Sequence, residues 1–225
     1  MSDPHPAGTW AEEDFVERWI AHDSMVAILE LPMRISAALI HESGIQVRRV
    51  VDVGSGPGTF LRILLEEFPD AEGVWIDASD AMLARAEESL ADLAPRVTFA
   101  VGDLREARSL PLSGDVIVSA RAVHHFLPET IEGFYRASRE ALSPGGFLCN
   151  LDHFATPGDW RERYKTIKRR FVPSSGGGSE SHTHDSPPQL LRDHLEWLHE
   201  NGFVDPDVPW RLFWTALLVA RTPSS

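Results

Sequence analysis

Three glycines gather in one short turn whose composition suits ligand binding. The segment Asp52-Val-Gly54-Ser55-Gly56-Pro-Gly58 follows a β-branched run at residues 50–53. Glycine lets the backbone adopt positive φ and approach a ligand closely. The dinucleotide pattern G-x-G-x-x-G is not met, because the third glycine position holds Thr59. The segment therefore predicts a turn that binds a small ligand, and it disfavours a nicotinamide enzyme.

Two aspartates follow the next apolar stretches along the chain. Asp77 comes directly after residues 74–76, and Gly102-Asp103-Leu104 comes after residues 97–101. Ligands of open α/β sheets bind at the carboxyl ends of the strands. A carboxylate at Asp77 can accept hydrogen bonds from both hydroxyls of a ribose, and Asp103 with Leu104 can meet an adenine edge. The combination predicts a nucleoside site more strongly than the glycine turn does alone.

Three histidines follow two further stretches and are the candidates for acid–base chemistry. His124 and His125 lie in the segment 119–126, and Asp152-His153 ends the stretch 147–152. Imidazole titrates near neutral pH, so it suits a general base for a hydroxyl, carboxyl or ring nitrogen. An aspartate beside such a base can orient the imidazole. The alternatives are a structural histidine at each position and a carboxylate that anchors a loop.

One later helix combines aromatic and basic residues. Trp160, Tyr164, Ile167 and Phe171 share one face of a predicted helix over 160–171. We expect this face to belong to the core, with a substrate cage as the alternative. Six basic residues surround it, at 161, 163, 165, 168, 169 and 170. They are a candidate site for a carboxylate or phosphate, although a solvated surface explains them as well.

Residues 173–189 are rich in Ser, Gly, His and Pro, and they predict a mobile loop. His182, His184 and Asp185 are residue types that bind divalent metals. Their place on a flexible segment argues against a metal site, so we expect no bound metal. A lid that carries a catalytic histidine and an inert loop are the two remaining interpretations.

The pattern of elements predicts an α/β fold with a doubly wound, mostly parallel sheet. Short apolar runs at 50–53, 74–76, 97–101, 115–119 and 147–152 alternate with helical periodicity at 60–68, 81–93 and 129–142. The region 10–42 predicts helices that Pro32 breaks or kinks, the second covering 33–41. A last helix at 190–201 precedes two closing strands, 203–204 and 211–221, in a hairpin.

Composition bounds the kind of protein. The chain has 225 residues and a formal net charge of −13, which argues against broad binding to nucleic acid or to an anionic membrane. No apolar run approaches the roughly 20 residues of a membrane span, and residues 1–8 lack the features of a secretory signal. The single cysteine, Cys149, leaves no intramolecular disulfide. We expect a cytoplasmic protein whose partner is a small molecule.

With these motifs in their order, the sequence resembles the class I S-adenosylmethionine-dependent methyltransferases. The residues that carry the resemblance are Val51 to Thr59, Asp77, Gly102-Asp103 and Leu142-Ser-Pro-Gly-Gly146, across roughly residues 45–155. The resemblance implies a Rossmann-like sheet of seven strands with an antiparallel last strand. It also implies one domain: a helical cap at 1–44, a cofactor core at 45–155, substrate-cap helices and a loop at 156–202, and closing strands at 203–225.

The resemblance further implies S-adenosylmethionine as cofactor and a set of residues around it. The glycine turn would flank the methionine moiety, Asp77 would bind the ribose, and Ala78 with Met82 would touch the adenine. For Met82, a core position in the second helix is the alternative. Arg34 could pair with the methionine carboxylate, with a surface ion pair as the alternative. The full set of expected cofactor residues is Arg34, Asp52, Gly54, Ser55, Gly56, Gly58, Asp77, Ala78, Met82, Asp103, Leu104 and Ala120.

The expected reaction is methyl transfer to an oxygen or nitrogen of a small metabolite, with an acidic metabolite as a candidate. The expected catalytic residues are His125, His153 and His124. An Asn/Asp-Pro-Pro-Tyr/Phe signature, frequent in enzymes that methylate nucleic-acid amino groups, is absent after the fourth strand. A tRNA-modifying enzyme and a non-catalytic protein that binds the cofactor are the competing interpretations, and the sequence leaves the oligomeric state open.

Overall fold

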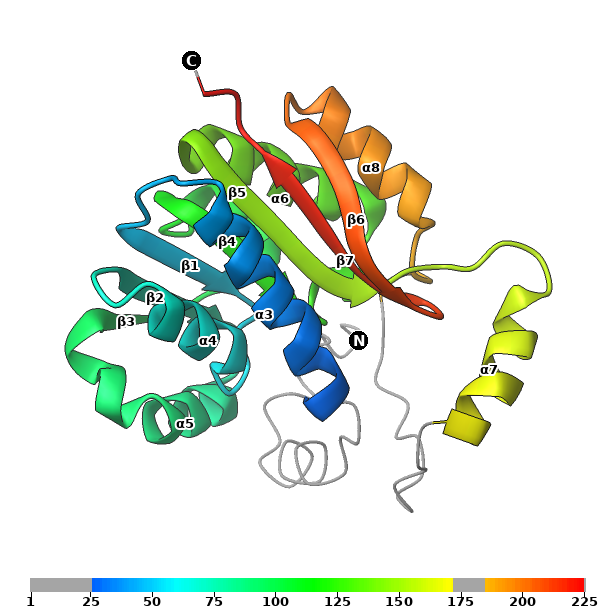
Figure 1. The fold of residues 1–225 in the computed structure, drawn as a ribbon, viewed down its shortest axis with the longest axis horizontal. Helices are drawn as coiled ribbons and strands as arrows, with labels where there is room; N and C mark the ends of the chain where they lie inside the picture. Colours follow the sequence, from blue (N-terminus) through cyan, green and yellow to red (C-terminus); the bar gives the residue numbers. More distant parts are fainter. Residues whose placement is uncertain (1–25, 172–184, 225) are drawn as a thin grey trace, which may run out of the picture.

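The computed structural model describes residues 26–171 and 185–224, which form a seven-stranded sheet with helices on both faces (Figure 1). The strands are β1 (Arg49–Val53), β2 (Glu72–Asp77), β3 (Val97–Val101), β4 (Gly114–Ala120), β5 (Leu142–His153), β6 (Val204–Leu212) and β7 (Thr215–Arg221). The α-helices are α3 (Val26–Glu42), α4 (Thr59–Glu67), α5 (Asp80–Ser89), α6 (Pro128–Ala141), α7 (Trp160–Phe171) and α8 (Leu191–Glu200). Three 3₁₀ turns complete the set: η1 (Ala91–Arg96), η2 (Leu104–Ser109) and η3 (Val123–His125).

The strand order in the sheet is β3-β2-β1-β4-β5-β7-β6. Strands β1 to β5 are parallel, and β7 runs antiparallel to both β5 and β6. The predicted doubly wound sheet of seven strands, with an antiparallel last strand, is confirmed. The chain leaves β1 toward β2 and later returns to β4 on the other side of β1. The carboxyl ends of β1 and β4 are therefore the switch point at which such sheets bind ligands.

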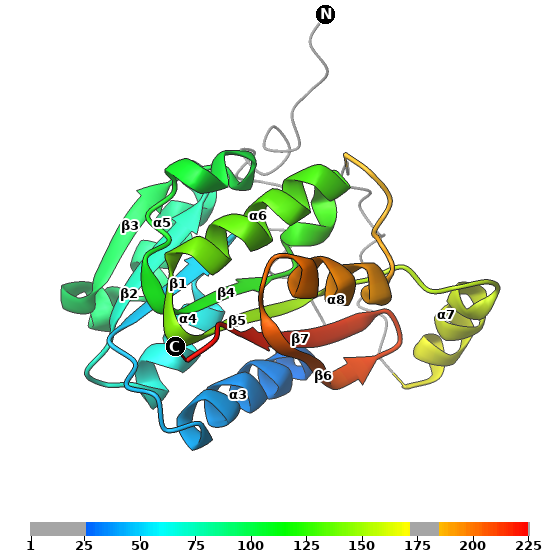
Figure 2. The ribbon, with the colours of Figure 1, turned by 90° about the horizontal axis from the view of Figure 1, so that it is seen from above.

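Most residues of the central strands β1, β2, β4 and β5 are buried, because helices cover both faces of the sheet. Along β4, Val116 and Val118 pack into one buried cluster with residues of α3, α4 and α5. Ile117, between them, packs into a second cluster with residues of η2, α6 and α8. Figure 2 shows the same division, with α6 and α8 on one side of the sheet and α3 and α4 on the other.

Helix α3 continues through Pro32, so the predicted break at this residue is wrong. A proline inside a helix costs about 3 kcal/mol, because it removes one hydrogen bond and crowds the preceding turn. The side chains of Leu29, Met33, Ala37 and Ile40 lie on one face of α3 and are buried. Burying a large apolar side chain contributes about 1.5–3 kcal/mol. Several such side chains on one face outweigh the proline.

Several element boundaries also differ from the predictions. In the closing hairpin, β6 covers Val204–Leu212 and β7 begins at Thr215, where strands at 203–204 and 211–221 were predicted. The helix predicted over 81–93 is α5, which ends at Ser89 and gives way to η1. Ser79 caps the start of α5, since its hydroxyl accepts a hydrogen bond from the N–H of Met82 at 3.2 Å. Strand β5 begins at Leu142 and therefore includes the predicted turn at 143–146, where its pairing with β4 shifts register.

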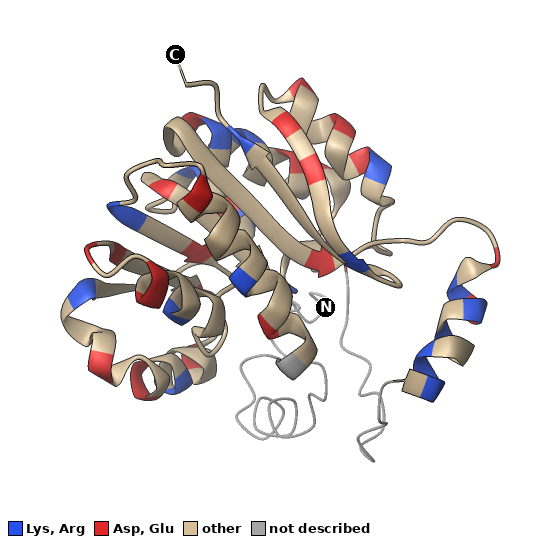
Figure 3. Cartoon of the chain, in the orientation of Figure 1, with Lys and Arg blue, Asp and Glu red and all other residues tan. Residues whose placement is uncertain are grey.

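Helix α7 has the predicted bounds, yet it buries none of its residues. Trp160, Ile167 and Phe171 expose 47%, 38% and 73% of their surface, so the expectation that this face belongs to the core is wrong. The helix stands away from the sheet, beyond the turn between β6 and β7 (Figure 1). Blue segments of Lys and Arg follow each other along it in Figure 3.

Some expectations fall on residues outside the described part of the chain. They are the helical start at 10–25, most of the predicted loop at 173–189, and the pair His182 and His184. Residues 185–189 of that predicted loop are described. Among the described residues, no cluster of three or more metal-ligating side chains occurs.

A buried polar network ties α6, α8 and β5 together. The hydroxyl of Tyr135 lies 2.7 Å from Nδ1 of His194 and accepts a hydrogen bond from the amide of Asn150 at 3.3 Å. All three side chains are almost inaccessible to solvent. Burial lowers the pKa of His194 to about 4. The imidazole is therefore neutral in the folded protein at neutral pH.

This network predicts a pH-dependent loss of stability. The unfolded chain binds a proton at His194 near pH 6.5, whereas the folded chain binds it near pH 4, so the contribution is lost as the pH falls through this window. Between pH 7 and pH 5, wild type should lose about 2 kcal/mol more unfolding free energy than His194→Gln. Urea denaturation at both pH values measures this difference. His199 is an exposed histidine on the same helix, and His199→Gln is the control. If His194→Gln loses as much unfolding free energy between the two pH values as His199→Gln does, the prediction is contradicted.

Candidate functional site

A cavity opens at the carboxyl ends of β1, β2 and β4, with a volume of about 1250 Å³ including its open mouth. Leu29 and Met33 of α3 close it on one side, and His125 and Phe126 line it on another. Its lining includes nine of the twelve predicted cofactor residues: Gly54, Ser55, Gly56, Asp77, Ala78, Met82, Asp103, Leu104 and Ala120. The remaining three, Arg34, Asp52 and Gly58, do not line it.

The glycine turn holds its shape through backbone bonds to β2. The N–H groups of Gly54 and Ser55 both donate to the carbonyl of Ile76, at 2.8 and 3.0 Å. The indole of Trp75 donates to the carbonyl of Gly56 at 2.8 Å. Gly54, Gly56 and Gly58 have φ values of 67°, 54° and 83°, a region that side chains disfavour.

The three glycines are required for different reasons. A Cβ on Gly54 would lie 2.3 Å from the Cβ of Ala122, and a Cβ on Gly58 would lie 2.7 Å from a methyl group of Leu90. Both glycines therefore allow close packing inside the protein. A Cβ on Gly56 would meet only the sulfur of Met82, at 3.8 Å. Gly56 is thus the glycine whose missing side chain leaves room in the cavity.

Asp52 supports the turn from behind the cavity wall. Its carboxylate accepts hydrogen bonds from the hydroxyl of Ser55 at 2.7 Å and from the N–H of Leu61 at 3.2 Å. Only 1% of its surface is exposed, and burial raises its pKa to about 7. The structure therefore assigns Asp52 to the connection between the turn and α4, where the sequence had suggested a direct cofactor contact.

Asp77 is the acidic group that faces the cavity at the end of β2. Its two oxygens accept hydrogen bonds from the N–H groups of Gly56, at 2.8 Å, and Ser79, at 3.0 Å. Burial raises the pKa of this carboxyl, and these hydrogen bonds oppose the rise. Each carboxylate oxygen has further lone pairs that a ligand hydroxyl can use. Met82 supplies an apolar surface beside it.

An ion-pair chain connects the end of β3 to the segment before α8. The guanidinium of Arg105 contacts the carboxylates of Asp103 at 2.9 Å and Asp185 at 2.7 Å. It also lies over the ring of Phe126, 4.9 Å from the centroid. The N–H of Asp185 donates to the carbonyl of His125 at 2.8 Å. Sequence analysis missed Arg105, because nothing in a lone arginine indicates two acidic partners, one of them 80 positions away.

The three predicted catalytic histidines lie together. The ring of His124 is 4.2 Å from that of His125 and 5.0 Å from that of His153. Asp152 contacts Nδ1 of His124 at 2.5 Å and accepts a hydrogen bond from its backbone N–H at 2.9 Å. Asp152 therefore orients His124, whereas the sequence had suggested that it orients its neighbour His153. His125 is the one of the three that lines the cavity.

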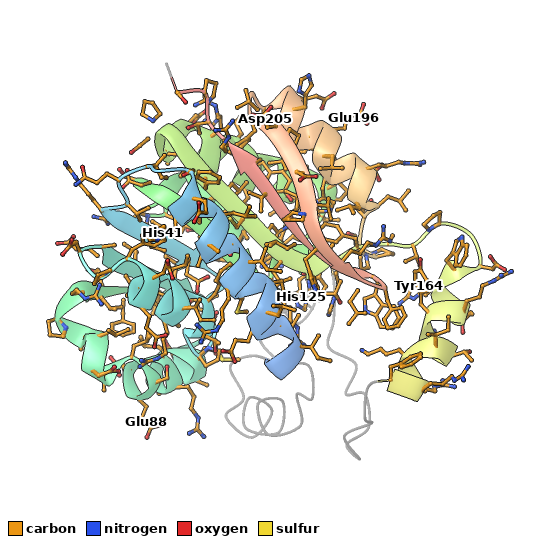
Figure 4. All side chains as sticks on the ribbon, in the orientation of Figure 1. His41, Glu88, His125, Tyr164, Glu196 and Asp205 are labelled. Carbon is orange, nitrogen blue, oxygen red and sulfur yellow. The ribbon has the colours of Figure 1, made fainter. Side chains whose placement is uncertain are left out.

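His153 has a different environment from the other two. Its Nδ1 lies 3.0 Å from the hydroxyl of Thr215 on β7. Burial lowers its pKa to about 3, with further lowering by the charges of His124, Arg121 and Lys168. A group with so low a pKa accepts a proton poorly. His125 is consequently the better candidate for a base. Figure 4 labels its position, near the ends of the strands.

Arg34 lies on the exposed face of α3. Its guanidinium pairs with Glu30 one helical turn earlier, at 2.8 Å, and more than half of its side chain is exposed. Arg34 therefore forms a surface ion pair, which is the alternative that the sequence left open. In this structure Arg34 is not part of the cavity wall.

Comparison with known proteins extends these observations. A sequence model described as a methyltransferase domain matches residues 50–146, which include the glycine turn, Asp77 and His125. A trans-aconitate 2-methyltransferase of Rhodopseudomonas palustris is 29% identical over 77% of this chain and 77% of its own length. The predicted resemblance to the class I S-adenosylmethionine-dependent methyltransferases is confirmed over these residues.

Other similar proteins are longer than this chain. A 3-amino-4-hydroxybenzoate 4-O-methyltransferase of Streptomyces cremeus is 30% identical over 59% of the chain and 36% of its own length. An aclacinomycin 10-hydroxylase of Streptomyces purpurascens is 34% identical over 58% and 35%. The chain thus spans about a third of these two relatives. A solved O-methyltransferase family protein of Burkholderia thailandensis has the same fold, with a TM-score of 0.63 at 20% identity over 93% of this chain and 63% of that one.

S-adenosylmethionine is the predicted cofactor, and the cavity suits it. Asp77 offers a hydrogen-bond acceptor for a ribose diol, and Met82 offers an apolar surface for a flat base. The space over Gly56 is open, as its Cβ distance shows. In the part of the chain that the structure describes, no helix has the length and apolar character that crossing a membrane requires.

The glycine turn predicts two different losses on substitution. Gly54→Ala should destabilise the fold by several kcal/mol, since its Cβ would overlap Ala122 and its φ is positive. Gly56→Ala should cost only about 1–2 kcal/mol of stability for the left-handed backbone, yet weaken binding of S-adenosylhomocysteine. Thermal unfolding and calorimetry separate the two effects. Unchanged affinity in folded Gly56→Ala would show that the turn does not border the ligand. Equal stability losses in the two variants would contradict the difference in packing between the two glycines.

Proposed function

We propose that the chain transfers the methyl group of S-adenosylmethionine to an oxygen or nitrogen of a small acidic metabolite. The observation that supports this most is one cavity that contains a nucleoside-type acidic site, Asp77, together with a histidine, His125. An adenosine site with no acid–base group would suit storage or sensing of the nucleoside. The presence of both in one cavity favours catalysis.

The cavity residues divide into three groups of contacts. The carboxylate of Asp77 binds the ribose hydroxyls. Ala78, Met82 and Leu104 pack against the adenine, and the carboxylate of Asp103 accepts a hydrogen bond from its amino group. The backbone of Gly54, Ser55 and Gly56, with Ala120 beside it, surrounds the methionine moiety. When bound, S-adenosylmethionine supplies a methyl group on a positively charged sulfur, which a nucleophile displaces in line. The protein itself has to exclude water and align the acceptor.

The histidine cluster handles the proton of the acceptor. His125 takes a proton from the hydroxyl or amine of the acceptor through an imidazole nitrogen. Asp152 orients His124, and the ring of His124 packs against that of His125. The backbone N–H of Asp185 fixes the carbonyl of His125 at 2.8 Å. These contacts keep the imidazole in place while the acceptor exchanges.

An acidic acceptor is supported by two named relatives and by the chain's local charges. The relatives' names give 3-amino-4-hydroxybenzoate and trans-aconitate as acceptors, and both are carboxylic acids. Near the histidines, the positive charges of Arg121 and Lys168 contribute to lowering the pKa of His153. A tRNA acceptor is disfavoured by the net charge of −13. Hydroxylation is a second candidate, because one relative is named as a hydroxylase.

The cofactor proposal is tested by calorimetry with S-adenosylhomocysteine. Asp77→Ala should weaken binding by about 1–3 kcal/mol, because charge-assisted hydrogen bonds to the ribose are lost. Asp70→Ala, an exposed aspartate just before β2, is the matched control and should bind as wild type does. Undiminished affinity in Asp77→Ala removes this residue from the ribose site.

The reaction is tested with a metabolite extract and isotope-labelled S-adenosylmethionine. Mass spectrometry should find the label in a small molecule whose mass rises by one methyl group. On that acceptor, His125→Ala should lower the turnover rate by about 10²–10⁴-fold, with the affinity for S-adenosylhomocysteine unchanged. His199→Ala is the exposed control. Labelled RNA in place of a labelled metabolite contradicts the proposal. Full turnover in His125→Ala contradicts the role of His125 as a base and indicates that catalysis comes from alignment of the reactants alone.

A further inference from the structure

Arg105 lies between two sides of the cavity that come from distant parts of the chain. It belongs to the turn η2 after β3, and it lines the cavity. Asp103 lines the side at which the proposed function places the adenine. His125 and Phe126 line the side at which it places the acceptor. A residue between these two sides can connect binding of the cofactor to the position of the base.

On the adenine side, Arg105 holds the carboxylate of Asp103 through both of its oxygens. Oδ1 accepts a hydrogen bond from the backbone N–H of Arg105 at 2.8 Å, and Oδ2 accepts one from Nη1 at 2.9 Å. The side chains of Asp103 and Arg105 are 21% and 28% exposed, so water screens this ion pair only in part. A carboxylate oxygen can accept more than one hydrogen bond, so the amino group of an adenine can be a further donor.

On the histidine side, the same guanidinium holds the segment 185–186. Its Nη2 donates to Oδ2 of Asp185 at 2.7 Å. The N–H of Asp185 donates to the carbonyl of His125 at 2.8 Å, and the hydroxyl of Ser186 donates to the carbonyl of Phe126 at 3.0 Å. The guanidinium carbon also lies 4.9 Å from the centroid of the Phe126 ring, a cation–π distance. Residues 185–186 are therefore attached both to Arg105 and to the backbone that carries His125.

An arginine suits this place because its guanidinium is a rigid, planar fork. Nη1 and Nη2 donate to two different carboxylates, so the orientation of Asp103 depends on that of Asp185. Hydrogen bonds between charged groups are stronger than those between neutral groups. Without the cation, the two carboxylates would lie near each other as like charges, which repel. The guanidinium is thus the group on which the contact between the two sides depends.

We propose that Arg105 is a positioning residue, through which binding of the adenosine moiety fixes the backbone of His125. An adenine that donates to Asp103 restrains this carboxylate, and with it the guanidinium of Arg105. The guanidinium in turn restrains Asp185, whose N–H holds the carbonyl of His125. Cofactor binding therefore fixes the histidine side of the cavity before the acceptor enters. This inference rests on the proposed function, since it concerns the cofactor and the base of the same site.

The experiment follows the hydrogen bond between Asp185 and His125. NMR measures the rate at which the amide proton of Asp185 exchanges with water, which reports how often this hydrogen bond opens locally. The rate is measured in the free protein and with saturating S-adenosylhomocysteine. In wild type the ligand should slow the exchange about tenfold, because opening then also disturbs the charge-assisted hydrogen bonds of Arg105 and the bond to the adenine.

Substitutions of Arg105 assign that effect to the guanidinium. Arg105→Met keeps an apolar stem beside Phe126 and removes both ion pairs, so the ligand should slow the exchange by less than about twofold. Arg105→Lys should recover only part of the effect, because an ammonium lacks the fork that reaches two carboxylates. Arg108, on the same turn, is 72% exposed and pairs with Glu140 at 3.8 Å. Arg108→Met is the matched control and should behave as wild type does.

A substitution at the other end of the connection gives an independent measurement. Asp103→Ala leaves Arg105 and Asp185 in place and removes the group that meets the adenine. At a concentration of S-adenosylhomocysteine that saturates this variant, the Asp185 amide should exchange as fast as in its free form. An ion pair with a structural role alone would change the exchange of the free protein and leave the effect of the ligand as in wild type.

The outcomes separate this inference from the proposed function. If the ligand binds wild type without slowing the exchange, or slows it equally in wild type and in Arg105→Met, the role of Arg105 is overturned. If Arg105→Met does not fold, an equal slowing in wild type and Asp103→Ala overturns it. Failure of wild type to bind S-adenosylhomocysteine contradicts the proposed function, and with it the connection to the adenine. The free proteins then test the remaining contact: the Asp185 amide should exchange about tenfold faster in Arg105→Met than in Arg108→Met, and equal rates overturn this contact as well.

Discussion

Gly54, after β1, packs against Ala122, after β4, so closely that no side chain fits between them. One partner of this contact begins the glycine turn, and the other leads within two residues to His124. The nucleoside end of the cavity and the histidine end are thereby held at a fixed separation by the protein backbone. Alignment of two reactants is the main requirement of a displacement reaction. The structure meets it through the spacing of two neighbouring strands.

Three buried carboxylates complete this framework, and each ends or lies near the end of a strand. Asp52, Asp77 and Asp152 accept hydrogen bonds from backbone N–H groups of the turn that follows or lies beside them. Burial raises the pKa of all three, so ionisation of these carboxyl groups is disfavoured at this edge. The apolar contacts of the sheet offset the free energy of burying these carboxyl groups. Their hydrogen bonds fix the backbones of the loops before any ligand binds.

The part of the cavity around the glycine turn, Asp77 and Asp103 was predictable because its signals are local. Each of these features follows an apolar run, and their positions in the cavity depend only on strand order. The surroundings of the three histidines were not predictable in the same way. Asp152 orients His124 rather than its neighbour, and Arg105 pairs with Asp185 across 80 positions. Such pairings depend on how strands β4 and β5 lie side by side, which no spacing in the sequence indicates.

The errors have a common physical origin as well. Pro32 was expected to break a helix because local propensity disfavours it, and tertiary burial of one helix face overrides that preference. The aromatic face of α7 was expected in the core because apolar periodicity usually means burial, yet periodicity alone does not say what covers a face. In both cases the missing information is the partner surface. Local pattern determines the element, and the neighbouring elements determine its environment.

Helix α7 contributes nothing to the buried clusters that hold the sheet together. Substitutions on its exposed surface therefore escape the folding constraint that acts on β1 to β5. A lineage that carries this fold can exchange residues here without loss of the buried sheet or of the strand ends that line the cavity. Divergence between related chains is then expected to be recorded in α7, while the strand ends stay nearly constant. The same separation makes α7 a segment that can be randomised without loss of the fold.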